Sequence, residues 1–247
     1  MEINKIRVVK KRDYPGLGKL YDAFDVSDDG EICLTIGGDG TFLKAAREFT
    51  GPILPIREGG RDSLGFNADY TLADIDKVIH GLRNKLFTIE EYSKLKFTYD
   101  RTVYNAINDV ILYRVNAKTV HCRIYYFEDK SKKLLYPADL KGDGVIFSGQ
   151  IGSTAYNFIA NGPIIYGLDI ITVTPIMANY RTSVVCNKEF YVEITKNIGY
   201  IEYDGIKLDE LSKGDSFTIK KSDKKIQIIK LKEKESFSKK LSRLFNF

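Results

Sequence analysis

The sequence is poor in the residues that build metal sites and disulfide frameworks. Its three cysteines, Cys33, Cys122 and Cys186, lie far apart and form no CxxC pair, and its two histidines have no HExxH context. This pattern argues against a zinc site and against a disulfide framework. We expect the cysteines to be buried free thiols, and we expect neither His80 nor His121 to serve in a metal site or a catalytic triad.

Long apolar runs are also missing. No stretch of about eighteen apolar residues is present, which predicts that no helix crosses a membrane. The first residues, MEINKIRVV, contain no apolar core long enough for a signal peptide, so we expect a cytoplasmic location. With 247 residues, the chain is long enough for one large domain or two modest ones.

The formal net charge of +5 is unevenly distributed. Residues 220–243 contain ten basic and three acidic residues, so the rest of the chain has a small negative net charge. The surface is therefore not expected to be uniformly basic, and nucleic acid is not an expected partner. We interpret the basic segment as solvated lysines around a terminal strand and helix rather than as a polybasic patch.

In the first third of the chain, apolar runs typical of buried strands alternate with segments of helical spacing. The runs lie at 6–10, 32–36 and 53–56, and the helical segments at 17–24, 42–47 and 71–82, the last with Thr71 as its N-cap. Strands that alternate with helices indicate a parallel sheet. We therefore predict an α/β domain over residues 1–95.

After residue 86, β-branched and aromatic residues dominate and helical spacing is mostly absent. The predicted strands lie at 103–112, 120–127, 170–173, 190–194, 217–220 and 226–231, with a hairpin turn at Asp204-Gly205 and one helix at about 153–160. This pattern predicts a β-rich, mostly antiparallel domain over residues 96–235. A last helix over residues 236–247, capped by Ser236, is expected to pack back on the first domain.

The strongest local feature is GGDGT at residues 37–41, which follows a predicted buried strand and opens a predicted helix. Glycines allow close backbone approach, and a helix N-terminus presents free N–H groups to an anion, so the loop is a candidate phosphate cradle. It is neither a GxGxxG nor a Walker A motif. An aspartate repels phosphates, but Asp39 is suited to take a proton from an attacking hydroxyl. The alternative is a tight turn that Asp39 caps.

Two further segments place polar residues where strands end. Asn108 and Asp109 interrupt a β-rich stretch, although Asn and Asp have low strand propensity, which indicates a polar pocket wall or else a bulge or turn. An aspartate there can accept ribose hydroxyls, and an asparagine can bind an amide or base edge.

Residues 142–156, GDGVIFSGQIGSTAY, lead from a strand to a helix through glycines and hydroxyls. That segment predicts a second anion or ribose site, or a capped helix with a packed Tyr156.

Together, these segments resemble the NAD kinase family. The marks of that family are GGDGT after a strand, an N-(E/D) pair and a GDG…GSTAY segment. In this chain they stand at residues 37–41, at Asn108-Asp109, and at Asp143 with residues 152–156. Residues 64–69, LGFNAD, resemble another family segment. The similarity covers roughly residues 32–220, which is most of the chain.

The resemblance implies transfer of a phosphoryl group from ATP or polyphosphate to the 2′-hydroxyl of the adenosine ribose of NAD, which gives NADP. It implies an α/β domain, a β-sandwich-like domain and an active site between them. Asp39 matches the general base. The positions that match the phosphate-binding loop are Gly38, Gly40 and Thr41, and those that match NAD contacts are Phe66, Asn108, Asp109, Thr154, Ala155 and Tyr156.

The resemblance also implies partners beyond the two substrates. Asp143 matches an aspartate whose side chain is directed toward the NAD of a neighbouring subunit. A homo-oligomer, either a dimer or a tetramer, is therefore expected. A divalent metal, usually Mg²⁺, comes with the donor phosphates, and no residue of the chain is expected to bind it directly.

The sequence departs from the family pattern in several places. Gln150-Ile151 stand where Thr-Pro is usual, Ile159 stands where a small or hydroxyl residue is usual, and the loop at residues 57–63 is longer and more charged. Two other functions remain as alternatives. A lipid kinase of the diacylglycerol kinase type shares GGDG but has no reason for Asn108-Asp109. A dinucleotide sensor without turnover gains little from Asp39 beside phosphates.

Overall fold

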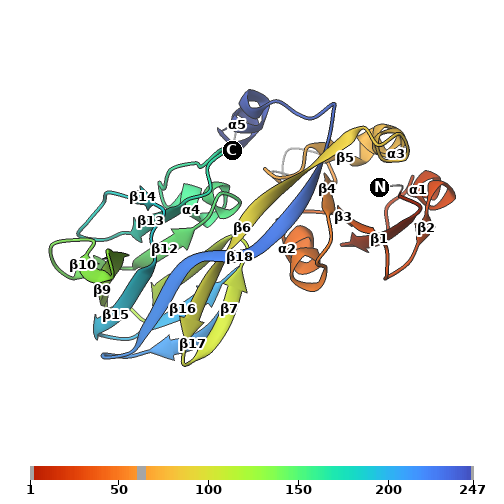
Figure 1. The fold of residues 1–247 in the computed structure, drawn as a ribbon. Helices are drawn as coiled ribbons and strands as arrows, with labels where there is room; N and C mark the ends of the chain where they lie inside the picture. Colours follow the sequence, from red (N-terminus) through yellow and green to blue (C-terminus); the bar gives the residue numbers. More distant parts are fainter. Residues whose placement is uncertain (1–2, 60–64, 246–247) are drawn as a thin grey trace. The chain divides into compact units, whose positions relative to one another are not determined.

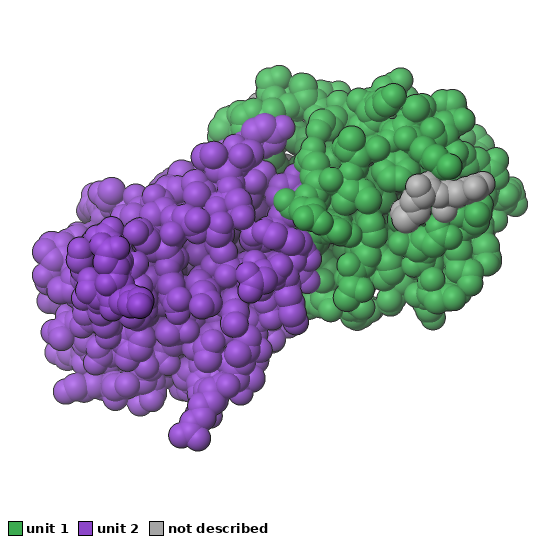
Figure 2. Space-filling view, in the orientation of Figure 1, with its two compact units in different colours: residues 1–91, 226–247 green, residues 92–225 purple. Residues whose placement is uncertain are grey.

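The computed structural model describes residues 3–59 and 65–245, and the chain divides into two compact units (Figure 2). Unit 1 combines Met1–Glu91 with Ile226–Phe247, and unit 2 is Tyr92–Lys225. The chain leaves unit 1 within strand β6 (Phe87–Tyr99) and returns within strand β18 (Ser216–Leu231). Residues 226–235, which were expected in the β-rich domain, therefore belong to unit 1.

Unit 1 is built on a mostly parallel sheet with the strand order β18-β4-β3-β1-β2, and β5 pairs with β4 (Figure 1). Its other strands are β1 (Lys5–Lys10), β2 (Asp25–Val26), β3 (Ile32–Ile36), β4 (Ile53–Arg57) and β5 (Tyr70–Thr71). Every residue of β3 is buried, as is typical of a parallel strand covered on both faces. The predicted α/β fold with a parallel sheet is confirmed.

Each helix of unit 1 buries apolar side chains. They are α1 (Gly18–Ala23), α2 (Asp39–Glu48), α3 (Ile75–Arg83) and α5 (Phe237–Phe245). Leu20 of α1 and Val78 of α3 join the same apolar cluster as Leu34 of β3. The segment predicted as a helix at 71–82 begins with a 3₁₀ turn, η1 (Leu72–Asp74), before α3 starts. The Asp74 carboxylate accepts hydrogen bonds from the Thr71 N–H at 2.9 Å and the Thr71 hydroxyl at 2.8 Å, which fixes this start.

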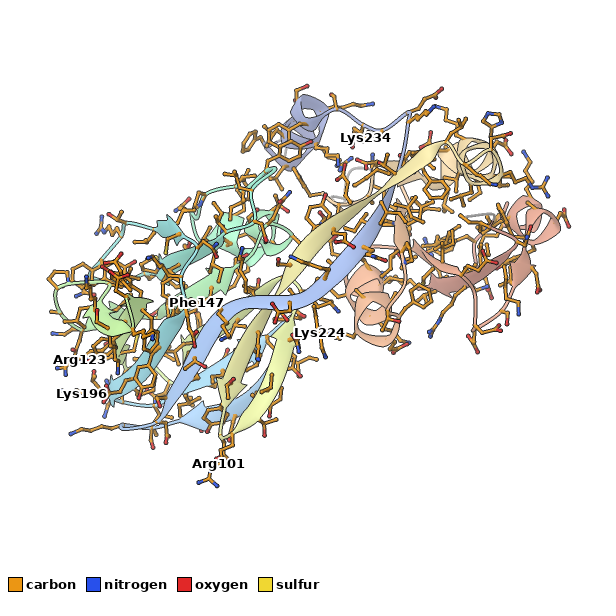
Figure 3. All side chains as sticks on the ribbon, in the orientation of Figure 1. Arg101, Arg123, Phe147, Lys196, Lys224 and Lys234 are labelled. Atoms are coloured by element: carbon orange, nitrogen blue, oxygen red, sulfur yellow. The ribbon has the colours of Figure 1, made fainter. Side chains whose placement is uncertain are left out.

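Unit 2 is β-rich and antiparallel, as predicted. One sheet has the order β14-β13-β12-β8-β16-β17, and a second group contains β10-β9-β15-β18 together with β11, β6 and β7. The strands are β7 (Thr102–Ala106), β8 (Asp109–Arg114), β9 (Val120–Glu128), β10 (Ser131–Leu134), β11 (Leu140–Gly142), β12 (Gly144–Ser148), β13 (Ile171–Ile176), β14 (Val184–Cys186), β15 (Phe190–Lys196), β16 (Gly199–Tyr203) and β17 (Ile206–Leu211). Phe147 of β12 lies in the core, with its ring 5.5 Å from that of Phe190 and 6.4 Å from that of Phe217 (Figure 3).

Some element boundaries differ from the sequence predictions. The stretch expected as one strand at 103–112 is divided into β7 and β8, and the two strands expected at 217–220 and 226–231 are joined in β18. The helix expected at 153–160 is a 3₁₀ turn, η2 (Gly152–Thr154), followed by α4 (Tyr156–Ile159). Cys33 and Cys122 are buried as expected, whereas Cys186 is only partly buried.

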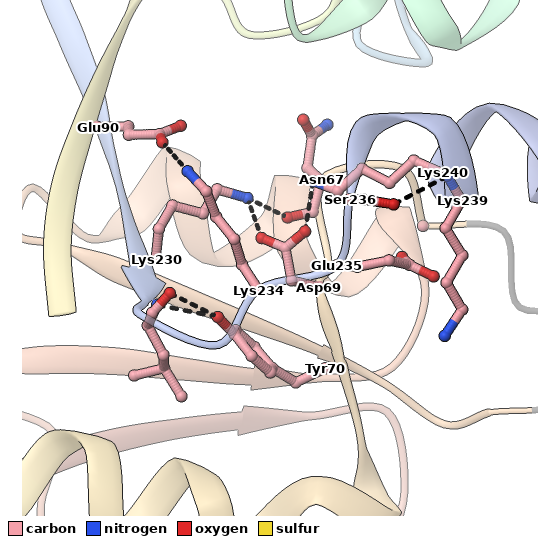
Figure 4. A network of polar contacts seen from close by, with 12 residues as sticks. Asn67, Asp69, Tyr70, Glu90, Lys230, Lys234, Glu235, Ser236, Lys239 and Lys240 are labelled. Atoms are coloured by element: carbon pink, nitrogen blue, oxygen red, sulfur yellow. Dashed lines mark hydrogen bonds and ion pairs between the residues drawn. The ribbon is translucent and has the colours of Figure 1, made fainter. Parts of the chain in front are cut away.

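The C-terminal helix α5 is held in unit 1 by buried charges (Figure 4). The buried Asp69 carboxylate lies between two buried ammonium groups: Lys230 Nζ is 2.6 Å from Asp69 Oδ2, and Lys240 of α5 pairs with Asp69 Oδ1. Lys230 also donates to the carbonyl of Asn67 at 3.1 Å. Removing one partner of such a group leaves a buried charge without its counterion, so α5 and the Asn67–Asp69 segment are coupled. Ser236 caps α5 by accepting the Lys239 N–H at 3.3 Å.

Candidate functional site

The GGDGT loop joins the end of β3 to the start of α2. Gly37 has φ +149°, and a Cβ at this position would lie 2.5 Å from Thr41 Oγ1, so only glycine fits the turn. Cβ positions at Gly38 and Gly40 would meet no atom within 4 Å. The loop therefore packs tightly at Gly37 and is open at Gly38 and Gly40, next to the start of α2.

Asp39 is the first residue of α2 and its side chain is exposed to solvent. Loss of hydration in its surroundings nevertheless raises the pKa of the Asp39 carboxyl, and the positive charge of Arg243 opposes this rise. A carboxylate whose pKa is moved toward neutrality is a better proton acceptor than an ordinary aspartate. The position at the N-terminus of a helix also stabilises a negative charge.

A small hollow lies beside Asp39 within unit 1. Its volume is about 10 Å³, which is room for one water molecule. The lining residues are Thr35, Gly37, Gly38, Asp39, Phe42, Pro55, Gly65, Asn67 and Ala68. The predicted cradle and the predicted LGF segment are thus brought together, although Leu64 and residues 60–63 of the charged loop lie outside the described residues.

Phe66 lies on that second segment and is held by the C-terminal helix. Its ring packs edge-on against Phe237, with the centroids 6.3 Å apart, and the Lys240 ammonium lies 5.6 Å from its centroid. Arg243 of α5 donates to the carbonyl of Gly65 at 3.2 Å. The sequence did not indicate that α5 supports this segment, because the contacts link residues more than 160 positions apart.

Asn108 and Asp109 lie where β7 ends and β8 begins. The Asp204 carboxylate, from the turn between β16 and β17, accepts the backbone N–H groups of Ile107 at 2.9 Å, Asn108 at 2.7 Å and Asp109 at 3.4 Å. These bonds explain why the predicted strand at 103–112 is interrupted here. The sequence pattern indicated Asp204 only as a hairpin-turn residue and did not predict this contact.

The Asp109 side chain is 5% exposed. Burial, followed by the negative charges of Asp204 and Glu202, raises the pKa of Asp109 to about 7. The carboxyl group of Asp109 therefore changes its charge near neutral pH. A buried carboxyl that titrates in this range is a frequent mark of a functional site.

The GSTAY segment adjoins the Asn108-Asp109 turn. A Cβ at Gly152 would lie 1.9 Å from the carbonyl oxygen of Asn108, so glycine is required for this close approach. Ser148 Oγ donates to the same carbonyl at 3.1 Å. Residues that are 40 or more positions apart in sequence thus form one polar corner of unit 2.

Within this corner, the hydroxyl-bearing residues are fixed by local bonds. Thr154 Oγ1 donates to the carbonyl of Ile151 at 3.3 Å, and Ala155 breaks the helix between η2 and α4 with φ −97° and ψ −130°. Asn157 Oδ1 accepts hydroxyls of Thr172 at 3.0 Å and Thr174 at 2.7 Å, which ties α4 to β13. This buried network explains why the predicted single helix is broken and short.

Tyr156 and Asp143 lie toward the opposite end of β12. Ser148, at the end of β12, pairs with Asp109, whereas Gly144, at its beginning, pairs with Tyr113. Asp143 precedes Gly144 and is ion-paired to Arg114, with Nε 2.7 Å from Oδ1. Tyr156 is hydrogen-bonded to Tyr113, and burial raises the pKa of its phenol. The structure therefore does not bring Asp143 to the Asn108-Asp109 turn.

Ile159, which departs from the family pattern, is 73% exposed.

Two kinds of feature are absent from residues 3–59 and 65–245. No helix in this part of the chain is long and apolar enough to span a bilayer. Nor do these residues contain a group of three or more His, Cys, Asp or Glu side chains placed to hold a metal ion.

Comparison with known proteins identifies similar chains over both units. Residues 5–87 match the model of the ATP-NAD kinase N-terminal domain, and residues 107–231 match that of the ATP-NAD kinase C-terminal domain. The NAD kinase of Natranaerobius thermophilus is 32% identical over 219 residues, which cover 84% of this chain and 75% of that protein. An NAD kinase of Clostridium perfringens is 30% identical over 265 residues, which cover 99% and 93% respectively.

Two solved structures share the fold. An NAD kinase from Archaeoglobus fulgidus in complex with ATP matches with a TM-score of 0.80 and 19% identity, over 98% of this chain and 99% of that one. Yeast NADH kinase complexed with NADH matches with a TM-score of 0.82 and 18% identity, over 100% and 88%.

Proposed function

The chain belongs to the NAD kinase family, and on this premise we propose that it transfers a phosphoryl group from ATP or polyphosphate to the 2′-hydroxyl of the adenosine ribose of NAD. The match of both units to the two family domains supports this function most directly. The exposed aspartate at the open start of α2 favours catalysis over binding alone, because a carboxylate repels phosphates and is useful there as a base.

In this proposal, the donor phosphates bind at the N-terminus of α2. The open outer side of Gly38 and Gly40 lets phosphate oxygens approach the N–H groups, and Thr41 contributes its hydroxyl. Asp39 orients the ribose hydroxyl and accepts its proton as the new O–P bond forms and the bond to the leaving phosphate breaks. Its raised pKa suits this task.

A divalent cation fits this arrangement if it arrives with the donor. Mg²⁺ usually keeps several waters and binds phosphate oxygens together with one or two carboxylates, rather than an all-protein cage. The described residues offer no such cage, and Asp39 is the carboxylate at the loop. The cation would neutralise phosphate charge, while the α2 N–H groups and Thr41 hold the phosphates in place.

We assign the NAD-binding roles to the residues that match the family. Asp109 accepts ribose hydroxyls, Asn108 binds an amide or base edge, and Phe66 and Tyr156 offer ring faces. Thr154 and Ala155 belong to the same GSTAY segment and take the same role in this proposal. The proximity of Gly152 to Asn108 and the buried bonds that order this corner support the assignment.

We also propose that Asp143 acts toward the NAD of a neighbouring subunit, which requires a homo-oligomer. The match of Asp143 to the family's GDG segment supports this role. Light scattering on the active protein is expected to give a mass at least twice 28.1 kDa. A fully active 28.1 kDa species would remove this role.

The proposed function is tested by incubating the purified protein with NAD, Mg²⁺ and either ATP or polyphosphate, followed by an NADP-specific assay. Formation of NADP with at least one donor is expected. A rise in melting temperature with NAD, combined with no NADP from either donor, would instead identify a dinucleotide sensor. A stabilising effect of a lipid head group but not of NAD would favour a lipid kinase.

A further inference from the structure

Asp204 has an unusual position for a turn residue. It lies between β16 and β17 with φ +48°, and it is only 7% exposed. A left-handed turn position is usually occupied by Gly or Asn, and it needs no buried carboxylate. Here, the carboxylate extends to a different part of the chain, about 95 positions earlier.

The target of this carboxylate is the turn between β7 and β8. Asp204 Oδ1 accepts the N–H groups of Ile107 at 3.1 Å, Asn108 at 2.7 Å and Asp109 at 3.4 Å, and Oδ2 accepts the Ile107 N–H at 2.9 Å. The three N–H groups point toward Asp204, at the end of β16, because the chain turns between β7 and β8. Without this acceptor, the N–H groups would be left unsatisfied at a mostly buried position, which would destabilise the turn.

We infer that Asp204 is a positioning residue that fixes the Asn108-Asp109 turn for the ribose of NAD. The inference rests on the proposed function, because it gives a role to residues assigned to NAD binding. The backbone of both residues is bonded directly to the Asp204 side chain, so the directions of their own side chains depend on it. Asp204 itself makes no contact with substrate in this proposal.

A second consequence is electrostatic. The charges that act on Asp109 come from the β16–β17 hairpin, namely Asp204 and Glu202, while β12 faces it with the neutral Ser148. Lys94 of β6 lies near Asp204 and favours its negative charge. Burial and the two hairpin carboxylates together raise the pKa of Asp109 to about 7. NAD affinity is therefore expected to fall as the pH drops through 7 and Asp109 loses its charge.

The decisive comparison is between Asp204→Asn and Glu202→Gln. Both variants remove a negative charge near Asp109, but only the first alters a group that is bonded to the Asn108-Asp109 backbone. For Asp204→Asn, we expect the KM for NAD at pH 8 to rise at least about tenfold, as for loss of a charged hydrogen bond, with little change in kcat. For Glu202→Gln, we expect an unchanged KM at pH 8. In both, the acid limb of kcat/KM should move to lower pH.

The coupling can also be measured without turnover. Carbon-13 NMR of the Asp109 carboxyl, assigned with Asp109→Asn, should show a titration midpoint near 7 that moves down in both variants. Failure of wild-type protein to bind NAD would refute the proposed function while the NMR titration still tests the link between Asp204 and Asp109. An Asp204→Asn protein with a lower melting temperature, but with an unchanged KM and an unchanged midpoint, would overturn the inference. If this variant does not fold, Asp204→Glu displaces the carboxylate from the same N–H groups, and an unchanged KM for NAD in that variant would do so.

Discussion

The two aspartates that carry the proposed function, Asp39 of unit 1 and Asp109 of unit 2, lie in opposite kinds of surroundings. Asp39 starts a helix, is exposed to solvent, and belongs to a loop whose tight contact joins Gly37 and Thr41, only four positions apart. Asp109 starts a strand, is buried, and is held by Asp204 from another hairpin. In the proposed roles, the group that takes the proton from the substrate is exposed, whereas the group that binds the ribose is buried and held by a second hairpin.

The same contrast appears in their charges. Both aspartates have a raised pKa because of lost hydration, but Arg243 opposes the rise at Asp39, whereas Asp204 and Glu202 add to it at Asp109. The helix that carries Arg243 is anchored through Asp69 and Lys240, so the C-terminal helix influences the loop electrostatically. The predictions below separate the two aspartates by the property that each change affects.

Asp39→Asn is expected to have the largest effect. The amide keeps the shape of the side chain but cannot accept the proton of the ribose hydroxyl, and loss of a general base typically lowers kcat by about 10²–10⁴-fold. Steady-state rates with saturating NAD and donor measure this loss, with the exposed Asp28→Asn as a control that keeps its rate. A folded Asp39→Asn protein with most of its kcat would show that Asp39 only caps the turn.

Asp109→Asn is expected to change stability in a pH-dependent way. Because the folded state raises the pKa of Asp109 from 3.8 to about 7, its charge destabilises the fold by an amount that grows between these values and is complete above them. With about 1.4 kcal/mol for each unit of a roughly three-unit rise, the variant should gain on the order of 4 kcal/mol in unfolding free energy at about pH 8 relative to about pH 4. Urea unfolding at both values tests this, and equal effects would contradict it.

Gly37→Ala and Gly38→Ala should separate the tight and open sides of the GGDGT loop. Alanine at 37 meets Thr41 Oγ1 and requires φ +149°, so unfolding free energy should fall by about 1–3 kcal/mol. Alanine at 38 meets nothing, so stability should change little, while the added methyl group hinders phosphates and raises the KM for the donor. Equal melting temperatures for the two variants would contradict this description of the loop.

Ile159→Ser should have the smallest effect. Because the side chain is 73% exposed, the change in stability should stay within about 0.5 kcal/mol. A new hydroxyl that bonds NAD would contribute on the order of 1 kcal/mol, so the KM for NAD should fall several-fold. Melting temperature and KM are measured together, and an unchanged KM would show that position 159 does not contact NAD.

The sequence predicted the features that depend on neighbouring residues. The GGDGT turn, the Thr71–Asp74 start of a helix and the Ser236 cap involve contacts within four positions, and each was visible in the pattern. A bulge or turn at Asn108-Asp109 was one of the two interpretations of the sequence, but the carboxylate of Asp204 that holds this turn was not foreseen, because it comes from a hairpin about 95 positions away. The broken helix at Ala155 likewise depends on Asn157 and its bonds to the distant β13. Polar contacts between distant residues depend on how the strands are arranged in the fold. The local residue pattern does not specify that arrangement.

The division of roles between the two aspartates is tested most directly by measuring NAD affinity and single-turnover rate for Asp39→Asn and Asp109→Asn side by side. Asp39→Asn should bind NAD within a few-fold of the wild-type affinity and lose most of the transfer rate. Asp109→Asn should bind NAD about tenfold or more weakly and, once saturated, transfer at a rate near that of the wild type. If both variants lost affinity and rate in the same proportion, the two aspartates would not have the separate roles assigned to them.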